Sequence, residues 1–418
     1  MTKVFKFIVI LSAVLMLAPA AFATNGDNLI GIGPIARSMG GVGIAAPQDA
    51  IGAVFANPAA MCFGPYCPSS EINFGGTLFM PHPKTEITSG GQTFKATSSE
   101  KVYMIPAIGV SVPISTQAPF WRFGLAAYGV TGLGVDYRGT SVDAPGHFFG
   151  QAPLIAGEFS ELQIMKFAPA LSCQPIPELS FGLAVHVDYA SLDLRQGASA
   201  NYGLGVQAGS IYKLTDSLSL GLNYVSPQNV KHKNVTDFDN NGTLDNLDLE
   251  SPQQVGLGLA YTFLDNKLLL EGDVKWINWA DANGYESFDW RDQWVYSIGA
   301  QVKPISNLAL RVGYNYARNP VKNHDGFSGR TNTSIQGKII PTYFFETFRI
   351  VGFPAIVEHH ITCGLGYEFS PRFALNAGYM HAFEKGITER GTDITGQPVS
   401  IKSTLYEDSI DFGFTWRF

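Results

Sequence analysis

A run of oxygen-bearing side chains between residues 237 and 248 could hold a metal ion. The stretch reads D-F-D-N-N-G-T-L-D-N-L-D, which has the spacing of a calcium loop. In such a loop a glycine at the sixth position permits a sharp turn, and the oxygens converge on a hard cation. The last residue is Asp rather than Glu, so bidentate closure is left open, and a solvated acidic tip is the alternative. The expected ligands are Asp237, Asp239, Asn241, Thr243 (through its carbonyl), Asp245 and Asp248.

Two cysteines, Cys62 and Cys67, flank the sequence F-G-P-Y near the N-terminal end. In an oxidising compartment they could pair as a local disulfide staple. The short loop that they close would gain limited stability. A zinc site at this spacing would need two more ligands, and none stand nearby.

The N-terminus has the pattern of a secretory signal peptide. Lys3 and Lys6 precede the apolar run 7–20, and residues 21–23 read A-F-A, which supplies the small residues of a cleavage site. The run is too short to cross a membrane as a helix. We therefore expect residues 1–23 to be removed and the mature chain to begin at Thr24.

Period-two alternation recurs from residue 70 to the end of the chain. One face of each run is apolar, whereas the other carries glycine, polar and charged residues. A charge facing lipid at the bilayer midplane of a barrel costs about 2–4 kcal/mol, so the charged face must point inward. Short and long breaks alternate between the runs, as periplasmic turns and extracellular loops do. The expected strands are 70–81, 101–114, 120–137, 158–174, 178–194, 202–214, 217–229, 252–263, 267–279, 292–303, 307–318, 358–369, 372–384 and 405–418.

The last strand indicates an outer-membrane location. Residues 410–418 read I-D-F-G-F-T-W-R-F and place four aromatic side chains on one face. A barrel in lipid needs such a face, whereas the alternative is a buried edge strand of a soluble sandwich. The terminal Phe418 also resembles the signal that barrel-assembly machinery reads. We predict an all-β fold in which residues 69–418 form a 14-stranded antiparallel transmembrane β-barrel, in contact with outer-membrane lipid and lipopolysaccharide.

The segment ahead of the barrel, residues 24–68, does not alternate as strands do. It is rich in Gly and Ala and includes the tripeptide Asn57-Pro58-Ala59. The segment is too apolar for a disordered tail. It is either a flexible periplasmic extension or a hatch folded inside the lumen, where small residues would let it pack against the wall.

These features together resemble the FadL-type transporters of long-chain fatty acids and hydrophobic compounds. The matching residues are S-M-G-G-V-G-I-A at 38–45, the tripeptide at 57–59, the glycine-laden strand 120–137 and the aromatic C-terminus. The resemblance covers essentially the whole mature chain. It implies that residues 24–68 are a hatch, or plug, that closes the lumen.

The resemblance also implies a transport route: capture by outer loops, passage into a greasy lumen, and lateral escape through a gap in the wall. Glycines within strands mark bulges and bends. The gap is therefore expected at Gly129, Gly132 and Gly134 of the third strand. Relief of crowding near the hatch is the alternative role of these glycines.

One expected extracellular loop, residues 339–356, is unusually aromatic. Phe344, Phe345 and Phe348 would form an exposed apolar patch, which is typical of a site that binds something greasy. Phe148 and Phe149 on another loop could complete a capture groove. Packing of one loop on the other, without a binding role, is the alternative.

Three inward-facing cations, Arg311, Lys275 and Arg122, could hold a fatty-acid carboxylate in the lumen. All three could instead pair with lumen carboxylates as structural salt bridges. If no cation is free, an uncharged substrate such as an alkane or an aromatic compound is favoured.

The sequence thus predicts passive uptake of a hydrophobic small molecule by a monomeric barrel that is not an enzyme. No cofactor is required, and a structural calcium is the only candidate ion. One alternative is a general or specific porin, which would lack a plug and carry a charged constriction. A lipid-modifying enzyme would need a Ser/His/acid set, and the histidines have no Ser partner at motif spacing. The net charge is −7 and the basic residues form no cluster, which argues against nucleic acid as a partner.

Overall fold

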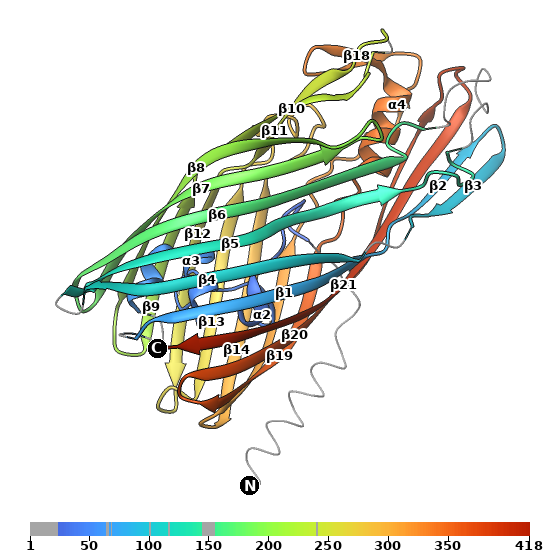
Figure 1. Cartoon of the computed structure of the whole chain (residues 1–418). Coiled ribbons are helices and arrows are strands. Elements are labelled where there is room, and N and C mark those ends of the chain that lie inside the picture. Colours follow the sequence, from blue (N-terminus) through green and yellow to red (C-terminus); the bar gives the residue numbers. More distant parts are fainter. Residues whose placement is uncertain are drawn as a thin grey trace, which may run out of the picture.

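The computed structural model describes residues 24–63, 67, 69–99, 102–115, 118–143, 155–239 and 241–418. Fourteen strands close into an antiparallel barrel, because β1 (Glu71–Pro81) pairs with β4 (Tyr103–Ser115) on one side and β21 (Pro398–Arg417) on the other (Figure 1). The predicted fold class is confirmed. The remaining wall strands are β5 (Ala118–Asp136), β6 (Phe159–Ile176), β7 (Leu179–Asp193), β8 (Ser199–Lys213), β9 (Leu218–Val225), β12 (Gln254–Phe263), β13 (Leu268–Ile277), β14 (Gln293–Ile305), β15 (Leu308–Ala317), β19 (His359–Ser370) and β20 (Phe373–Thr392).

The wall strands sort their side chains as the alternation predicts. On β7, Leu183 is 64% exposed on the outer surface, whereas His186 and Asp188 are buried on the inner side. On β21, Phe412 and Trp416 face outward while Asp411 is buried. The barrel therefore offers lipid an apolar band and keeps its charges inside.

The long loops carry structure that the alternation does not predict. A hairpin of β2 (Lys84–Ser89) and β3 (Gln92–Thr97) continues the wall beside β21. A second hairpin, β10 (Gln228–Thr236) with β11 (Asp245–Ser251), follows β9. No helix among the described residues is long and apolar enough to cross a membrane. The loop between β15 and β19 contains β16 (Phe327–Ser328), β17 (Asn332–Ile335), β18 (Lys338–Pro341), the helix α4 (Thr342–Thr347) and the π-helical turn η2 (Phe348–Gly352).

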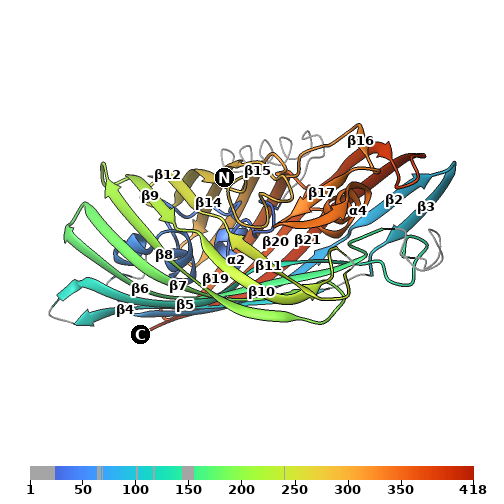
Figure 2. The same cartoon turned by 90° about the horizontal axis from the view of Figure 1, so that it is seen from above.

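The segment ahead of β1 lies within the ring of strands (Figures 1 and 2). It contains the helix α2 (Gly33–Arg37), the helix α3 (Ala50–Ala56) and the 3₁₀ turn η1 (Pro58–Cys62). Nearly all of its residues are buried, because its backbone amides and small side chains meet inward-facing wall residues. We call residues 24–63 the hatch segment.

Candidate functional site

Asn57 fastens the hatch segment to the wall. It stands between α3 and η1, and its Oδ1 accepts a hydrogen bond from the Ala59 amide at 3.1 Å. Its Nδ2 donates to the carbonyls of Ile44 (2.8 Å), Ser210 (3.1 Å) and Leu222 (3.2 Å). One side chain therefore joins two parts of the hatch segment to β8 and β9.

Glycines on the inner face of the wall leave the space that Asn57 and its neighbours occupy. A Cβ on Gly182 would lie 2.2 Å from the Ala59 nitrogen, and a Cβ on Gly209 would lie 2.0 Å from the Asn57 Oδ1. Pro58 begins η1, where its missing N–H costs nothing. The tripeptide thus docks directly on wall backbone, a contact that no local sequence signal marks.

Two inward-facing carboxylates hold the middle of the hatch segment. Glu271 accepts from the amides of Ala45 (2.8 Å) and Ala46 (2.9 Å). Asp273 accepts from the amide of Gly43 at 2.9 Å. Both carboxylates bind hatch backbone, and the Asp273 carboxylate also interacts electrostatically with Lys275.

Two of the predicted lumen cations, Arg311 and Lys275, differ in their surroundings. Arg311 donates to Gln301 (2.7 Å) and Asn376 (2.9 Å), so its guanidinium is engaged within the wall. Lys275 faces a lumen cavity, and its ammonium donates no hydrogen bond to any residue that the structure describes. Only Lys275 is placed to meet a solute in that cavity.

The lumen cavity lies between the hatch segment and inward-facing residues of β5, β6, β7, β9, β12 and β13. Its second lysine, Lys166, forms an ion pair with Asp188 at 2.7 Å and donates to Gln228. The apolar part of its lining includes Leu29, Ile32, Phe55, Tyr128, Val130 and Ile277. A solute with an apolar body and one anionic group would find both kinds of contact there.

The wall has an opening between β4 and β5. Their ladder runs only as far as the pair Ala107–Tyr128, and beyond it β5 pairs with β6 alone. The opening ends where the Ser99 amide donates to the Asp136 carbonyl at 2.9 Å. We call the gap beside residues 129–135 the wall opening. A groove on the barrel surface runs into it, lined in part by Gly129 and Gly132.

The predicted glycines and a bulge shape this opening. Pairing between β5 and β6 shifts register between Gly129 and Thr131. A Cβ on Gly129 would lie 2.4 Å from the Ile105 side chain, and one on Gly134 would lie 2.3 Å from the Ser160 carbonyl. A Cβ on Gly132 would make only ordinary contacts. The opening is therefore narrow, with the side chains of Ile105 and Tyr103 facing these glycines.

The bulge is linked directly to the hatch segment. The carbonyl of Val130, the extra residue of the bulge, accepts a hydrogen bond from the Leu29 amide at 3.0 Å. Val130 and Leu29 also line the lumen cavity. Cavity and opening therefore meet at this single backbone contact.

The predicted Cys62–Cys67 disulfide is absent, and this prediction is wrong. The structure forms no disulfide between them. Cys62 lies 3.2 Å from the Ser172 hydroxyl on the wall, whereas Cys67 turns back to the Met61 carbonyl at 3.0 Å. Packing of η1 against β6 directs the two sulfurs to different partners.

The aromatic loop is a packed layer and not an exposed groove, so the alternative of loop packing holds. Phe345 and Phe348 are buried, and Phe344 is partly buried. The Phe348 ring lies 5.5 Å from Phe288 and 6.0 Å from Phe238, which belong to two other loops. The other predicted capture residues, Phe148 and Phe149, lie outside the described residues.

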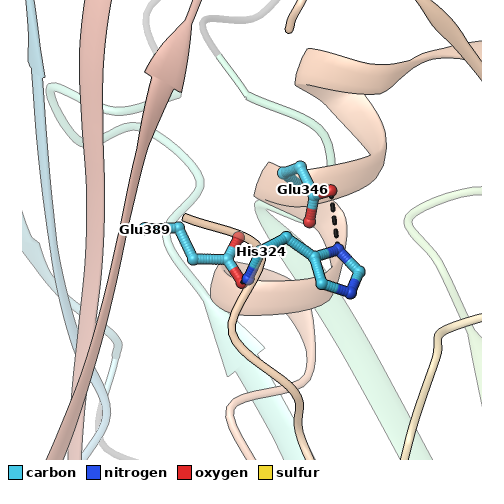
Figure 3. A group of neighbouring side chains, drawn as sticks. All are labelled: His324, Glu346 and Glu389. Carbon is cyan, nitrogen blue, oxygen red and sulfur yellow. Dashed lines mark hydrogen bonds and ion pairs between the residues drawn. The ribbon is translucent and has the colours of Figure 1, made fainter. Parts of the chain in front are cut away.

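A charge network holds the same loop to β20 (Figure 3). Both ring nitrogens of His324 lie 2.9 Å from a carboxylate, Nδ1 from Glu346 and Nε2 from Asp289. Arg349 donates to Glu346 at 2.8 Å and to Glu389 at 2.5 Å. The hydrogen bond to Glu346 raises the pKa of His324 above its usual value. Sequence spacing did not reveal this network, because its members come from three segments.

The acidic loop places part of the predicted calcium set together. Carboxylate oxygens of Asp237, Asp239 and Asp245 lie within 4.8 Å of one another. The Lys338 ammonium lies 2.6 Å from Asp245, so a lysine supplies the positive charge there. Asp248 lies apart, 3.5 Å from Lys231 across the β10–β11 hairpin. In the same loop, the Asn241 side chain accepts a hydrogen bond from the Thr243 amide at 2.9 Å.

Comparison with known proteins agrees with this architecture. The family model described as outer membrane protein transport protein (OMPP1/FadL/TodX) matches residues 195–327. The predicted resemblance to the FadL family is confirmed. The family match and the apolar outer surface place this barrel in the outer membrane. No curated protein sequence matches the chain.

Solved structures share the complete fold of this barrel. A FadL homologue of Pseudomonas aeruginosa has a TM-score of 0.70 at 15% identity, covering 95% of this chain and 99% of that one. The Pseudomonas putida toluene transporter TodX has a TM-score of 0.67 at 20% identity, covering 94% and 100%. The Ralstonia pickettii toluene transporter TbuX has a TM-score of 0.63 at 17% identity, covering 94% and 99%. At these identities the likeness establishes the fold.

Proposed function

We propose that this protein takes up hydrophobic small molecules across the outer membrane, from the lumen cavity through the wall opening into the bilayer. The observation that carries the proposal is the interrupted ladder between β4 and β5, with the bulge at Val130 beside the cavity. Solved barrels of the same fold include toluene transporters. Fatty acids and hydrocarbons are accordingly the classes of compound that we propose for this chain.

A lateral exit suits an apolar solute better than an aqueous pore does. Moving apolar surface from a greasy site into water costs about 25 cal/mol per Å². The straight path through the barrel is also occupied by the hatch segment, which is bound to several wall strands. This arrangement favours a transporter over the porin alternative.

Lys275 supports an amphipathic substrate with a carboxylate. Its ammonium has no hydrogen-bond partner among the described residues, while Leu29, Phe55 and Val130 offer apolar surface in the same cavity. A charge-assisted hydrogen bond contributes about 1.5–3 kcal/mol. Lys275→Met should therefore weaken fatty-acid binding at least tenfold and leave a neutral hydrocarbon of similar length unaffected. If the wild type and Lys275→Met bind the fatty acid with equal affinity, a neutral substrate would be favoured instead.

The route is tested by filling the wall opening. Gly132→Val should reduce uptake severalfold while surface level and ligand binding persist, because a Cβ there meets only Ile105 and Tyr103 at ordinary distance. Gly272→Val is the matched control, since its Cβ would lie 3.7 Å from the one heavy atom within reach. Undiminished uptake by Gly132→Val would instead indicate passage past the hatch segment into the periplasm.

A further inference from the structure

Glu407 is a buried acid in need of a cation. It lies on the inner side of β21 and is fully shielded from solvent. Neither of its carboxylate oxygens has a hydrogen-bond partner among the described residues. An ionised carboxylate in such a place is unfavourable unless it is paired.

Among the described residues, Arg37 brings a guanidinium charge near Glu407, but its hydrogen bonds go to other partners. Arg37 donates from Nε to Asp411 at 2.7 Å and from Nη2 to Ser409 at 2.7 Å. Its Nη1 donates to the Gly31 carbonyl at 3.3 Å. Arg37 therefore leaves the Glu407 carboxylate without a direct partner.

The start of the hatch segment reaches Glu407 from the other side. The Thr24 side chain interacts with the Glu407 carboxylate, although its hydroxyl forms no well-directed hydrogen bond. Thr24 is itself buried. Its backbone nitrogen is three bonds from that hydroxyl and so lies within a few ångström of the carboxylate.

We infer that Glu407 binds the α-ammonium of the processed chain. Hydrolysis of the Ala23–Thr24 bond by a signal peptidase consumes one water, leaves a carboxylate on Ala23 and converts the Thr24 amide nitrogen into an ammonium. A primary ammonium offers three donors and one positive charge to the unpaired acid.

This ion pair would make docking of the hatch segment depend on processing. Thr24 begins the stretch whose Leu29 amide binds the bulge at Val130. An unprocessed chain has only a neutral amide at Thr24, so Glu407 would have no directly bonded cation, and only the charge of Arg37 would act on it. Cleavage then supplies the ammonium that pairs with Glu407 inside the barrel. The inference is independent of which compound is transported.

Amine labelling of the mature protein tests the pair. Reductive methylation with formaldehyde at pH 7.5, followed by mass spectrometry of the N-terminal peptide, reports the reactivity of the Thr24 amine. A free α-amine has a lower pKa than lysine and reacts faster at this pH. In the wild-type barrel we expect Thr24 to react at least tenfold more slowly than the exposed Lys95, a result that requires no variant.

Two variants sharpen the test. Glu407→Gln should raise the Thr24 labelling rate at least tenfold, whereas Glu368→Gln, at a partly exposed carboxylate, should leave it unchanged. A mature chain that begins at another residue would overturn the inference. So would a Thr24 amine that reacts as fast as Lys95 in the wild type, or equally fast with and without Glu407.

Discussion

The two ends of the hatch segment are held by the barrel in different ways. The C-terminal half, residues 49–62, is tied down by the three carbonyl contacts of Asn57 and by direct packing on wall glycines. The N-terminal half, residues 24–32, meets the wall opening through the single Leu29–Val130 hydrogen bond. Both polar side-chain atoms of Asn25 and the Nδ2 of Asn28 lack a partner among the described residues.

This difference indicates which half a solute can displace. Each buried hydrogen bond that is broken without replacement costs about 1–3 kcal/mol. Moving the C-terminal half would break several such bonds. The stretch of the N-terminal half beside the opening, around Leu29, is held to the wall by one backbone hydrogen bond, and its neighbours Asn25 and Asn28 carry unsatisfied side-chain groups. The contact that blocks the path from cavity to opening belongs to the weakly held half.

Breaking the firm half should have the largest effect. Asn57→Ala leaves the carbonyls of Ile44, Ser210 and Leu222 without this donor and should weaken hatch docking by about 2–4 kcal/mol. Ion conductance in planar bilayers should rise from near zero while the barrel keeps its heat-modifiable migration. Gln174→Ala, at an exposed periplasmic turn, should stay silent. If the Asn57→Ala barrel conducts no ions, residues 49–62 must be held by other contacts.

Loosening the weak half should have a smaller and local effect. Tyr285 donates to the buried Asp27 carboxylate, and Tyr285→Phe removes a hydrogen bond worth about 1.5–3 kcal/mol. Hydrogen exchange should quicken in residues 25–32 and stay slow in residues 50–62. Tyr212→Phe, at an exposed site, is the control. Equal quickening of both halves would mean that the hatch segment moves as one body.

The outer loop that contains His324 lies apart from the hatch segment, so changes in it should not alter how either half of the hatch segment is held. Because the folded pKa of His324 is raised, its ion pairs stabilise the loop fully below about pH 6.5 and are lost as pH rises through the raised value. Protease protection of residues 318–358 should decline above neutral pH by about 1 kcal/mol. His324→Gln should abolish the pH dependence, and His381→Gln should retain it. A wild-type loop with flat protection from pH 6 to 9 would contradict the charged imidazole.

The acidic hairpin tip should have the smallest effect on transport. Calcium at Asp237, Asp239 and Asp245 must displace the Lys338 ammonium, so we predict weak binding that tightens in Lys338→Met. The double variant Asp237→Ala, Asp239→Ala should lose calcium-dependent protection of the loop and keep normal uptake. Asp216→Ala, at a periplasmic turn, is the control. Calorimetry without a binding signal at millimolar calcium would return these residues to a solvated tip.

Much of the barrel could be predicted because alternation is a local property. Each of the fourteen wall strands lies where period-two runs predicted it, and the chief differences are the extensions of β20 to Thr392 and of β21 back to Pro398. The glycines at 129, 132 and 134 were found for the same reason, since strand interiors seldom carry three.

The site contacts could not be predicted because they join distant segments. Asn57 acts through Gly182 and Gly209, and nothing local distinguishes those glycines from others on the wall. The stretch of β4 that pairs with β1 but not with β5 depends on the register between β4 and β5, which alternation alone does not determine. Phe348 is buried because it packs against Phe238 and Phe288, whose loops meet it only in the folded chain.

The most direct test of the lateral route is a reversible staple across the wall opening. A Cβ built on Gly129 lies 3.7 Å from the Ile105 Cβ, which matches the separation of about 3.8 Å in disulfides. In a barrel whose four native cysteines are replaced, Ile105→Cys with Gly129→Cys should join β4 to β5 on oxidation. We predict that uptake of a hydrophobic tracer falls at least tenfold in the oxidised barrel and recovers on reduction. Equal uptake in the two redox states would contradict transport through this opening.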